Sequence, residues 1–100
     1  MADLDRQEKI LELIRKLPEG FVTTYSDLCP EAPRLPGRIL AMNEDKDLPW
    51  HRVVRADGSF AQGERQRKLL RKEGIPFAGK RVDMESAHLP REALADLGKV

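Results

Sequence analysis

Residues 24–43 have the sequence TYSDLCPEAPRLPGRILAMN, and this stretch decides the fold. Thr24 can cap a short helix at residues 25–28, because a threonine oxygen accepts a hydrogen bond from the free backbone NH groups of a first turn. The cysteine and proline that follow end this helix. A second helix is predicted at about residues 33–43, where Pro36 falls in the first turn and leaves the helical hydrogen bonds intact. The apolar side of this second helix consists of Leu35, Ile39, Leu40 and Met42.

A longer amphipathic helix is predicted before this stretch. Apolar residues recur there at a spacing near 3.6, and a proline and a glycine at positions 18 and 20 end the pattern. The apolar positions, which place this helix at residues 4–17, are Leu4, Ile10, Leu11, Ile14 and Leu17. Residues 21–23 are too few for an independent strand. Two short helices joined by a tight turn, with an earlier helix to pack on, form a helix-turn-helix arrangement whose second helix would meet DNA.

The second half of the chain predicts a small β-hairpin. Residues 48–50 are expected to form a loop, and residues 51–54 a short buried strand. Asp57-Gly58 is a turn signal, after which residues 59–60 could return antiparallel to that strand. We therefore predict an α+β fold, mainly helical, that forms a winged-helix-like DNA-binding domain with a helix-turn-helix and a small β-hairpin wing.

Two further helices are predicted towards the end of the chain. One covers residues 66–72 and stops at Gly74, because glycine readily adopts the conformation that closes a helix. An extended piece then runs to about Asp83. A short final helix is predicted at residues 90–97, in a tail to which the sequence assigns no role.

The composition predicts one domain over residues 1–100 with a heavily charged surface. Of the 100 residues, 40% are hydrophobic and 35% are charged, and the mean hydropathy is −0.56. No apolar run approaches the roughly 18 residues that span a bilayer, and the first residues lack the apolar core of a signal peptide. We expect no membrane association. The expected location is the cytoplasm, in association with the nucleoid, or the nucleus if the source is a eukaryote.

Cysteine and histidine are too few for a disulfide or a recognisable metal centre. Cys29 is the only cysteine, so no internal disulfide can form. A metal ion would have to be held by Cys29, His51, His88 and carboxylates, which show no recognisable ligand spacing. We expect no metal and no cofactor.

Positive charge is concentrated locally, although the formal net charge is only +1. Overall attraction to nucleic acid would be weak, so DNA binding would depend on where the positive side chains stand. The clusters are Arg34 and Arg38, then Arg52 and Arg55, then Arg65, Arg67, Lys68, Arg71 and Lys72. The last cluster could equally be the solvated face of a helix.

The hexapeptide at residues 49–54, Pro-Trp-His-Arg-Val-Val, is the most informative functional motif. Further landmarks stand in order around it: residues 22–25, residues 34–37, Asn43, residues 56–58 and the run from Gln66 to Gly74. With these landmarks the chain resembles the alkyltransferase-like proteins over roughly residues 10–84. Their reactive relatives, the O6-alkylguanine-DNA alkyltransferases, carry cysteine where Trp50 stands and transfer the alkyl group of a damaged guanine irreversibly onto it.

The resemblance implies a sensor of DNA damage rather than an enzyme. An indole has neither an ionisable thiol nor comparable nucleophilicity, so recognition replaces reaction. The family implies a protein that flips O6-alkylguanine out of duplex DNA and marks it for nucleotide excision repair. Its partners would be duplex DNA containing O6-alkylguanine and the proteins of that pathway, and we expect it to act as a monomer.

The resemblance also assigns residues to DNA binding and base flipping. A tyrosine at the position of Tyr25 crowds the phosphate and drives rotation of the nucleotide, and an arginine at the position of Arg34 enters the stack. Arg38, one turn further along the same helix, competes with Arg34 for this role. Gly37 would allow close approach to the DNA backbone or, equally, tight helix packing. Asn43 is the last residue that the resemblance assigns to DNA binding.

Trp50 would form the apolar wall of the lesion pocket that the resemblance implies. It would lie against the flipped base and, because no attack geometry has to be met, accept alkyl groups of different sizes. Alternatively, Trp50 seals the core beside Val53, although Pro49 favours an exposed or turn placement. Backbone groups that could read the edge of the base are those of Trp50, Val53 and Val54.

His51 and Glu73 match a pair that activates the thiol in the reactive relatives. Without a cysteine, this pair would hold the pocket loop in shape. Arg52 would tether the same loop, through a carboxylate such as Glu73. The interval from Tyr25 to Arg34 is shorter than is usual in the family, so the turn between the two helices should be unusually tight.

Two other functions stay open from the sequence. Cys29 could be a displaced nucleophile with His51 as its base, which would give an active alkyltransferase or another thiol enzyme. A winged-helix transcription factor would instead read undamaged DNA sequence and be indifferent to lesions.

Overall fold

The computed structural model describes the backbone of residues 2–97 and the side chains of residues 5–96. The first helix, α1, spans Ala2–Arg15 and begins two residues before its predicted start. Ile10, Ile14 and Leu17 are buried, as their spacing predicts. The side chain of Leu4 lies outside the described residues.

The predicted helix-turn-helix is present, in α2 (Tyr25–Leu28) and α3 (Arg34–Met42). The hydroxyl of Thr24 accepts a hydrogen bond from the backbone NH of Asp27 at 3.1 Å, so Thr24 caps α2 as predicted. Pro36 is buried in the first turn of α3. Backbone hydrogen bonds of 3.1 and 3.0 Å close the short turn between the two helices. The local signals in the sequence therefore account for this part of the fold.

The strand predicted at residues 51–54 is wrong in its extent and in its partner. Trp50–Arg52 forms a 3-10 helix, η1, and only Val53–Val54 is a strand, β2. This strand pairs in parallel with β1 (Thr23–Thr24), not antiparallel with residues 59–60. Because neighbouring residues of a strand face opposite sides, the two valines are buried in two different apolar clusters. Apolar packing on both faces stabilises a pairing that is only two residues long.

The two apolar clusters lie on either side of this strand pair. The first packs α1 against the helix-turn-helix and consists of Ile10, Leu11, Ile14, Leu17, Leu28, Cys29, Ile39, Leu48, Val53 and Leu94. The second belongs to the later part of the chain and consists of Val22, Val54, Leu70, Ile75, Val82 and Ala87.

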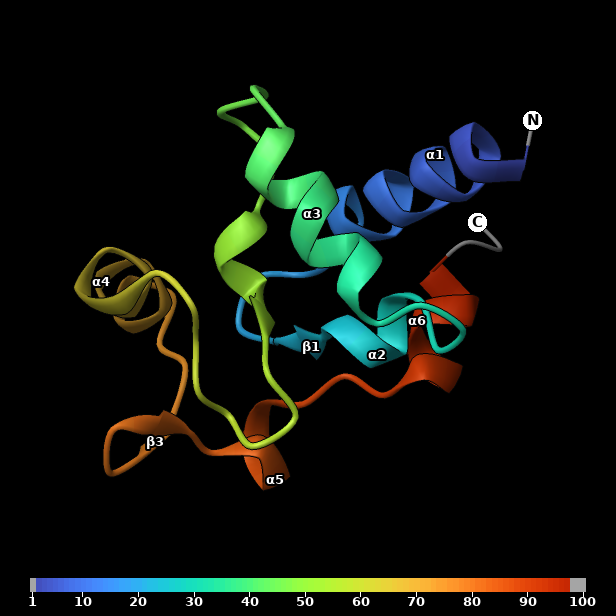
Figure 1. Cartoon of the computed structure of the whole chain (residues 1–100). Helices are drawn as coiled ribbons and strands as arrows, with labels where there is room; N and C mark the ends of the chain where they lie inside the picture. Colours follow the sequence, from blue (N-terminus) through green and yellow to red (C-terminus); the bar gives the residue numbers. More distant parts are fainter. Residues whose placement is uncertain (1, 98–100) are drawn as a thin grey trace.

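The later elements follow the predicted order with two differences. They are α4 (Gly63–Lys72), β3 (Phe77–Ala78), β4 (Arg81–Val82), α5 (Met84–Ala87) and α6 (Arg91–Leu97). Helix α4 begins three residues before its predicted start, and Gly74, with φ +78°, follows its end as predicted. The antiparallel hairpin is formed by β3 and β4, within the piece predicted as extended, and α5 was not predicted. In Figure 1, α1 and α4 lie on opposite sides of the molecule with α3 between them. None of the described helices is long and apolar enough to cross a membrane.

Gly58 brings the turn at residues 55–59 into direct contact with β4. The φ angle of Gly58 is +87°, and its carbonyl accepts a hydrogen bond from the backbone NH of Val82 at 2.9 Å. A Cβ atom on Gly58 would lie 2.4 Å from the carbonyl oxygen of Val82. The predicted turn therefore exists, but it docks on β4 and does not lead into a wing strand.

Gly58→Ala is expected to lower the free energy of unfolding by about 2 kcal/mol. Alanine is strained at this φ angle, and its methyl group would meet backbone that cannot move aside. Gly79→Ala is a matched control, because Gly79 also has a positive φ, +67°, but nothing lies within 4 Å of its Cβ position. Urea denaturation of both variants measures the difference, and equal losses would contradict the close packing of Gly58.

Candidate nucleic-acid interface

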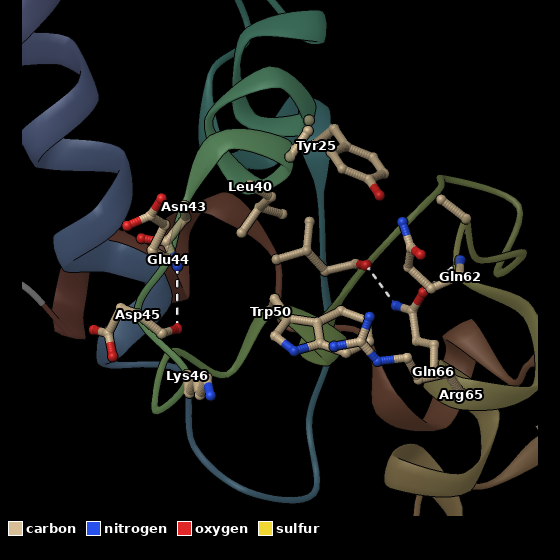
Figure 2. Close-up of a pocket in the computed structure, with 14 residues that line it drawn as sticks. Tyr25, Leu40, Asn43, Glu44, Asp45, Lys46, Trp50, Gln62, Arg65 and Gln66 are labelled. Carbon is tan, nitrogen blue, oxygen red and sulfur yellow. Dashed lines mark hydrogen bonds between the residues drawn. The ribbon is translucent and has the colours of Figure 1, made fainter.

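A pocket of about 700 Å³ opens between α3 and α4. In Figure 2, Tyr25 and Leu40 lie on the side of the helix-turn-helix, and Gln62 and Arg65 lie on the side of α4. Trp50 faces the space between them, and the hydroxyl of Tyr25 points into it. The structure thus brings together side chains from the helix-turn-helix, the hexapeptide and α4.

Pro49 turns Trp50 towards this pocket. The backbone angles of Pro49, φ −77° and ψ 61°, and the 2.7 Å hydrogen bond from the Trp50 NH to the Leu48 carbonyl define an inverse γ-turn. The indole ring is half-buried and meets the ring of His51 edge to face, with 6.0 Å between centroids. Trp50 belongs to neither apolar cluster. Its side chain lines a pocket rather than sealing the core, and Pro49 has the turn placement that was predicted.

Glu73 binds two side chains of the hexapeptide, those of His51 and Arg52. Its carboxylate accepts three hydrogen bonds of 2.8–3.0 Å from the guanidinium of Arg52 and one of 2.5 Å from Nε2 of His51. Arg52 also donates to the Leu17 carbonyl at 2.7 Å, and the Gly20 NH donates to Glu73 at 3.4 Å. The side chains of Glu73 and Arg52 are only 8% and 16% exposed. The predicted tether is present, and it also connects the end of α4 to the segment after α1.

The charge on Glu73 suits a brace better than a proton-transfer group. Burial raises the pKa of Glu73, but hydrogen bonds from Arg52, His51 and the Gly20 NH together lower it by more than burial raises it. The pKa therefore lies below its ordinary value of 4.5. A carboxyl group that exchanges protons near neutral pH needs a raised pKa. Glu73 is therefore a fixed negative charge under the pocket loop.

Gln66 fixes the pocket loop from the side of α4, and the sequence did not predict this role. The residue is 1% exposed. Its amide donates to the carbonyls of His51 and Val53 at 2.9 and 3.0 Å, and its oxygen accepts from the Gln62 NH at 3.2 Å. The signal in the sequence was a neutral polar residue four positions before Leu70 in an otherwise charged run.

Some of the backbone groups expected to read a base edge are already bonded inside the protein. The Trp50 NH donates to the Leu48 carbonyl, and the Val53 carbonyl accepts from Gln66.

Arg65 stacks on Trp50, although the sequence indicated it only as part of a charged run. Its guanidinium carbon lies 4.8 Å from the centroid of the indole, which is a cation–π distance. The prediction started the helix at Gln66 and so left Arg65 outside it. Because α4 begins at Gly63, Arg65 is instead an exposed helical residue at the mouth of the pocket.

Arg34 lies on the other side of Tyr25 from Trp50. A second, more open pocket of about 410 Å³ is lined by Tyr25, Arg34 and Arg55 among others, and Tyr25 borders both pockets. Burial raises the pKa of Tyr25, and the charge of nearby Arg55 opposes this only in part. The tyrosine hydroxyl is therefore protonated, and able to donate a hydrogen bond, at neutral pH.

Arg38 lies on another part of α3, and Asn43, just after α3, lines both the pocket at Tyr25 and the groove beside α1. Arg38 lines a groove of about 620 Å³ between α1 and α3, and it borders neither pocket at Tyr25. Of the two competing arginines, the structure places only Arg34 beside Tyr25. Asn43 follows the end of α3, and its side chain donates to the Asp45 carbonyl at 3.1 Å (Figure 2).

Gly37 faces Tyr25, with enough space for a methyl group between them. A Cβ atom on Gly37 would lie 3.7 Å from the tyrosine ring, which is an ordinary van der Waals distance. Packing within the protein therefore does not require glycine here, which favours the alternative that Gly37 allows DNA to approach α3.

Gly37→Ala is expected to separate stability from DNA binding. Alanine should stabilise the helix by up to about 1 kcal/mol, because glycine is a poor helix former. The added methyl group should weaken DNA binding by about 1–2 kcal/mol if the backbone of DNA packs there. Thermal denaturation and a titration with one duplex measure the two effects. Unchanged DNA affinity would show that Gly37 does not lie at the interface.

Cys29 and His51 are each engaged elsewhere. The thiol is buried in the first apolar cluster and donates to a carboxylate oxygen of Glu31 at 3.3 Å, while Nε2 of His51 is bonded to Glu73. Cys29 lines none of the three pockets described above. Among the residues that the structure describes, no three His, Cys, Asp or Glu side chains are grouped to hold a metal ion.

Comparisons with known proteins agree with this architecture. Residues 5–75 match the family model described as "6-O-methylguanine DNA methyltransferase, DNA binding domain". A DNA base-flipping protein of Escherichia coli (strain K12) is 34% identical over 89 residues, covering 78% of this chain and 69% of that protein. A methylated-DNA–protein-cysteine methyltransferase of Methanopyrus kandleri is 42% identical over 76 residues, covering 69% of this chain and 58% of that enzyme.

Solved structures share the fold. S. pombe Atl1 in complex with damaged DNA containing O6-carboxymethylguanine is similar with a TM-score of 0.72 at 20% identity, covering 86% of this chain and 96% of that chain. S. pombe ATL in complex with DNA gives a TM-score of 0.68 at 22% identity, covering 90% of this chain and 98% of that one. The mainly helical fold with small strands, expected from the sequence, is confirmed.

Proposed function

Because the chain belongs to the family defined by the DNA-binding domain of 6-O-methylguanine DNA methyltransferase, we propose that it is a non-enzymatic sensor of O6-alkylguanine. It would bind duplex DNA, flip the damaged nucleotide into the pocket between α3 and α4, and hold the base without transferring its alkyl group. The observation that carries this proposal is Trp50 in the wall of that pocket, where the reactive relatives that the sequence resembles have cysteine. A base-flipping relative and the Atl1 complex with damaged DNA support it.

The surroundings of Trp50 favour recognition over reaction. Indole cannot displace carbon from O6 at neutral pH as a thiolate can. His51 is held by Glu73, whose pKa is lowered, and the thiol of Cys29 is buried outside the pocket. With no attack geometry to satisfy, the pocket would accept alkyl groups of different sizes.

Base flipping would be driven from α2 and α3. Rotation of a nucleotide out of the stack costs a few kcal/mol. Tyr25, which points into the pocket, would crowd the phosphate, and Arg34 beside it would fill the vacancy and stack on the neighbouring bases. Gly37 and Asn43 would lie along the same DNA contact.

The sensor needs a second protein, because it leaves the lesion in place. We assign that role to nucleotide excision repair, which would recognise the marked complex. The chain would work as a monomeric single domain, residues 1–100, in the compartment that holds the DNA: the bacterial cytoplasm or the eukaryotic nucleus. Residues 98–100 lie outside the described structure.

A paired titration tests the proposal. Two duplexes that differ only in O6-methylguanine or guanine at one position are titrated at the same salt concentration, because phosphate contacts make affinity depend on salt. Much tighter binding to the lesion, reversal on dilution and no mass change on the protein are expected. Equal affinities would refute lesion sensing, and an alkyl adduct on Cys29 would revive the enzymatic alternative. Sequence preference among undamaged duplexes would support a transcription factor instead.

Trp50→Ala is expected to weaken binding to O6-benzylguanine DNA more than to O6-methylguanine DNA. Loss of a stacked aromatic ring costs about 1–3 kcal/mol per base, and the larger adduct loses more apolar contact. Titration of both duplexes gives the ratio of affinities. Trp50→Phe is the control, because it keeps an aromatic surface and should largely keep the ratio. An unchanged ratio in Trp50→Ala would place the alkyl group elsewhere.

A further inference from the structure

Helix α4 has three faces with different surroundings. Gln66 and Leu70 point inward and are buried. Arg67 and Arg71 lie over the ring of Phe77, at 5.6 and 5.8 Å from its centroid. Because successive residues of an α-helix are about 100° apart, the positions 65, 68 and 72 share a third face. This basic ridge consists of Arg65, Lys68 and Lys72, which are all exposed.

The basic ridge begins at the mouth of the pocket. Arg65, its first member, lines the pocket and lies over Trp50, whereas Lys68 and Lys72 lie outside the lining of the pocket. Lys68 and Lys72 continue the same line along the helix. At a rise of about 1.5 Å per residue, the ridge is roughly 10 Å long.

The charges of the two lysines are not neutralised within the protein. Among the described side chains, neither Lys68 nor Lys72 takes part in an ion pair. Arg67, one position away on a different face, pairs with Glu64 at 3.7 Å. The ridge is therefore a strip of free positive charge.

The opposite rim of the pocket is acidic. Glu44, Asp45 and Asp47 are exposed in the segment after α3, where Lys46 is the one basic residue among them and Asp45 lies 3.9 Å from the guanidinium of Arg15; residues 44–46 line the pocket. A polyanion that reaches the pocket is attracted on the side of α4 and repelled on the side of this acidic rim.

We propose that the basic ridge binds the phosphate backbone of the strand next to the flipped nucleotide, and that the acidic rim keeps the backbone off the other side. This inference rests on the proposed function and adds a second DNA contact to that of the helix-turn-helix. One strand carries a phosphate for about every 3.4 Å of helix axis, so a ridge of roughly 10 Å can meet two or three phosphates. The ridge contacts are independent of the base and should strengthen binding to damaged and undamaged duplexes equally.

The salt dependence of binding tests this assignment. Each phosphate contact contributes about −0.9 to the slope of log K against log salt concentration. Lys68→Gln/Lys72→Gln should make the slope less negative by about 1.8, for the O6-methylguanine duplex and the unmodified duplex alike, and leave the ratio of the two affinities unchanged. Lys68→Arg/Lys72→Arg, which keeps both charges, should retain the original slope.

The control is Lys9→Gln/Lys16→Gln, which removes the same net charge from α1, on the opposite side of the molecule from α4 (Figure 1), and from the residue that follows α1, where Lys16 is paired with Glu12 at 3.0 Å. Its slope should equal that of the parent protein. A ridge variant with the parent slope, or a control that changes the slope as much as the ridge variant, would overturn the proposal. Failure of the proposed lesion sensing would be seen separately, as equal affinity of the parent protein for the two duplexes. The role of the ridge is decided only by the slope of log K against log salt concentration.

Discussion

Glu73→Gln is expected to lower the free energy of unfolding by about 3–5 kcal/mol, because it removes one partner from a buried ion pair and leaves the other without compensation. The guanidinium of Arg52 and the ring of His51 both donate to this carboxylate, and the side chain of Arg52 is largely buried. A domain of this kind is stable by only about 5–15 kcal/mol in total. The loss should therefore be a large part of the stability.

Urea denaturation by circular dichroism gives this quantity. Glu64→Gln is a matched control on the same helix, because Glu64 is 74% exposed and its ion pair with Arg67 is long, 3.7 Å. It should change the free energy of unfolding by less than about 0.5 kcal/mol. Similar losses in both variants would show that the contacts of Glu73 with Arg52 and His51 contribute no more to stability than a surface charge does.

The pH dependence of this difference follows from the lowered pKa of Glu73. A carboxyl group whose pKa is lower in the folded than in the unfolded protein stabilises the fold fully above its unfolded value, here 4.5. That contribution is lost as the pH falls through the lower folded pKa. The difference in free energy of unfolding between the parent protein and Glu73→Gln should therefore be constant near neutral pH and become smaller below pH 4.5. A gap that grows in acid would contradict the assignment of the negative charge to Glu73.

Arg34→Ala is expected to weaken binding to an O6-methylguanine duplex by about 3 kcal/mol, roughly 150-fold. Two contributions are lost. Stacking of a planar group on a base is worth about 1–3 kcal/mol, and a hydrogen bond from a charged donor to the orphaned base about 1.5–3 kcal/mol. Titration at fixed salt measures the loss, and Tyr25→Ala should reduce affinity in the same assay.

Arg38→Ala is the matched control for Arg34→Ala. It removes the same charge from the same helix, one turn later, but from the groove beside α1 instead of the pocket beside Tyr25. Both variants should change the salt slope by no more than about one phosphate contact, and only Arg34→Ala should lose the larger, salt-independent part. A greater loss in Arg38→Ala would make Arg38 the residue that enters the stack.

The parts of the fold that the sequence predicted carry strong local signals. Thr24 fixes the start of α2, Pro36 is compatible only with the first turn of α3, and Gly74 follows the end of α4. Each of these residues acts on neighbours within a few positions, so its effect can be read from the sequence. The helix-turn-helix and the order of the later helices follow from such signals.

The parts that the sequence missed depend on contacts between distant segments. Val53 and Val54 have β-prone side chains, but only packing against two separate apolar clusters decides that they pair in parallel with β1. The turn at Gly58 looked like the tip of a wing, yet it docks on β4 through a contact with Val82 that no local pattern encodes. The hairpin was therefore expected at residues 51–60 and occurs at residues 77–82.

The site shows the same division. The motif predicted that Trp50 lines a pocket and that Arg52 tethers its loop through Glu73, and the structure has both features. Arg65 was missed as a member of the site because helix ends are poorly defined by sequence and the predicted helix began one residue after it. Gln66 was missed because its hydrogen bonds to the carbonyls of His51 and Val53 join distant segments. The observed start, three residues earlier, makes Arg65 a helical residue and places it over the indole.

The parallel pairing of β1 with β2 also has a consequence for how the protein folds. Thr23 pairs with Val53, and Thr24, the residue before α2, pairs with Val54. These pairings close a long loop of chain. Contacts between distant segments form slowly, because the entropy of loop closure must be overcome before they stabilise anything, whereas helices form from local contacts. During folding, α1 and α3 can therefore appear before Tyr25 and Trp50 face each other. A nascent or partly unfolded chain would have α3 and still lack the pocket between α3 and α4, so the base capture that we propose would require molecules that have completed their fold.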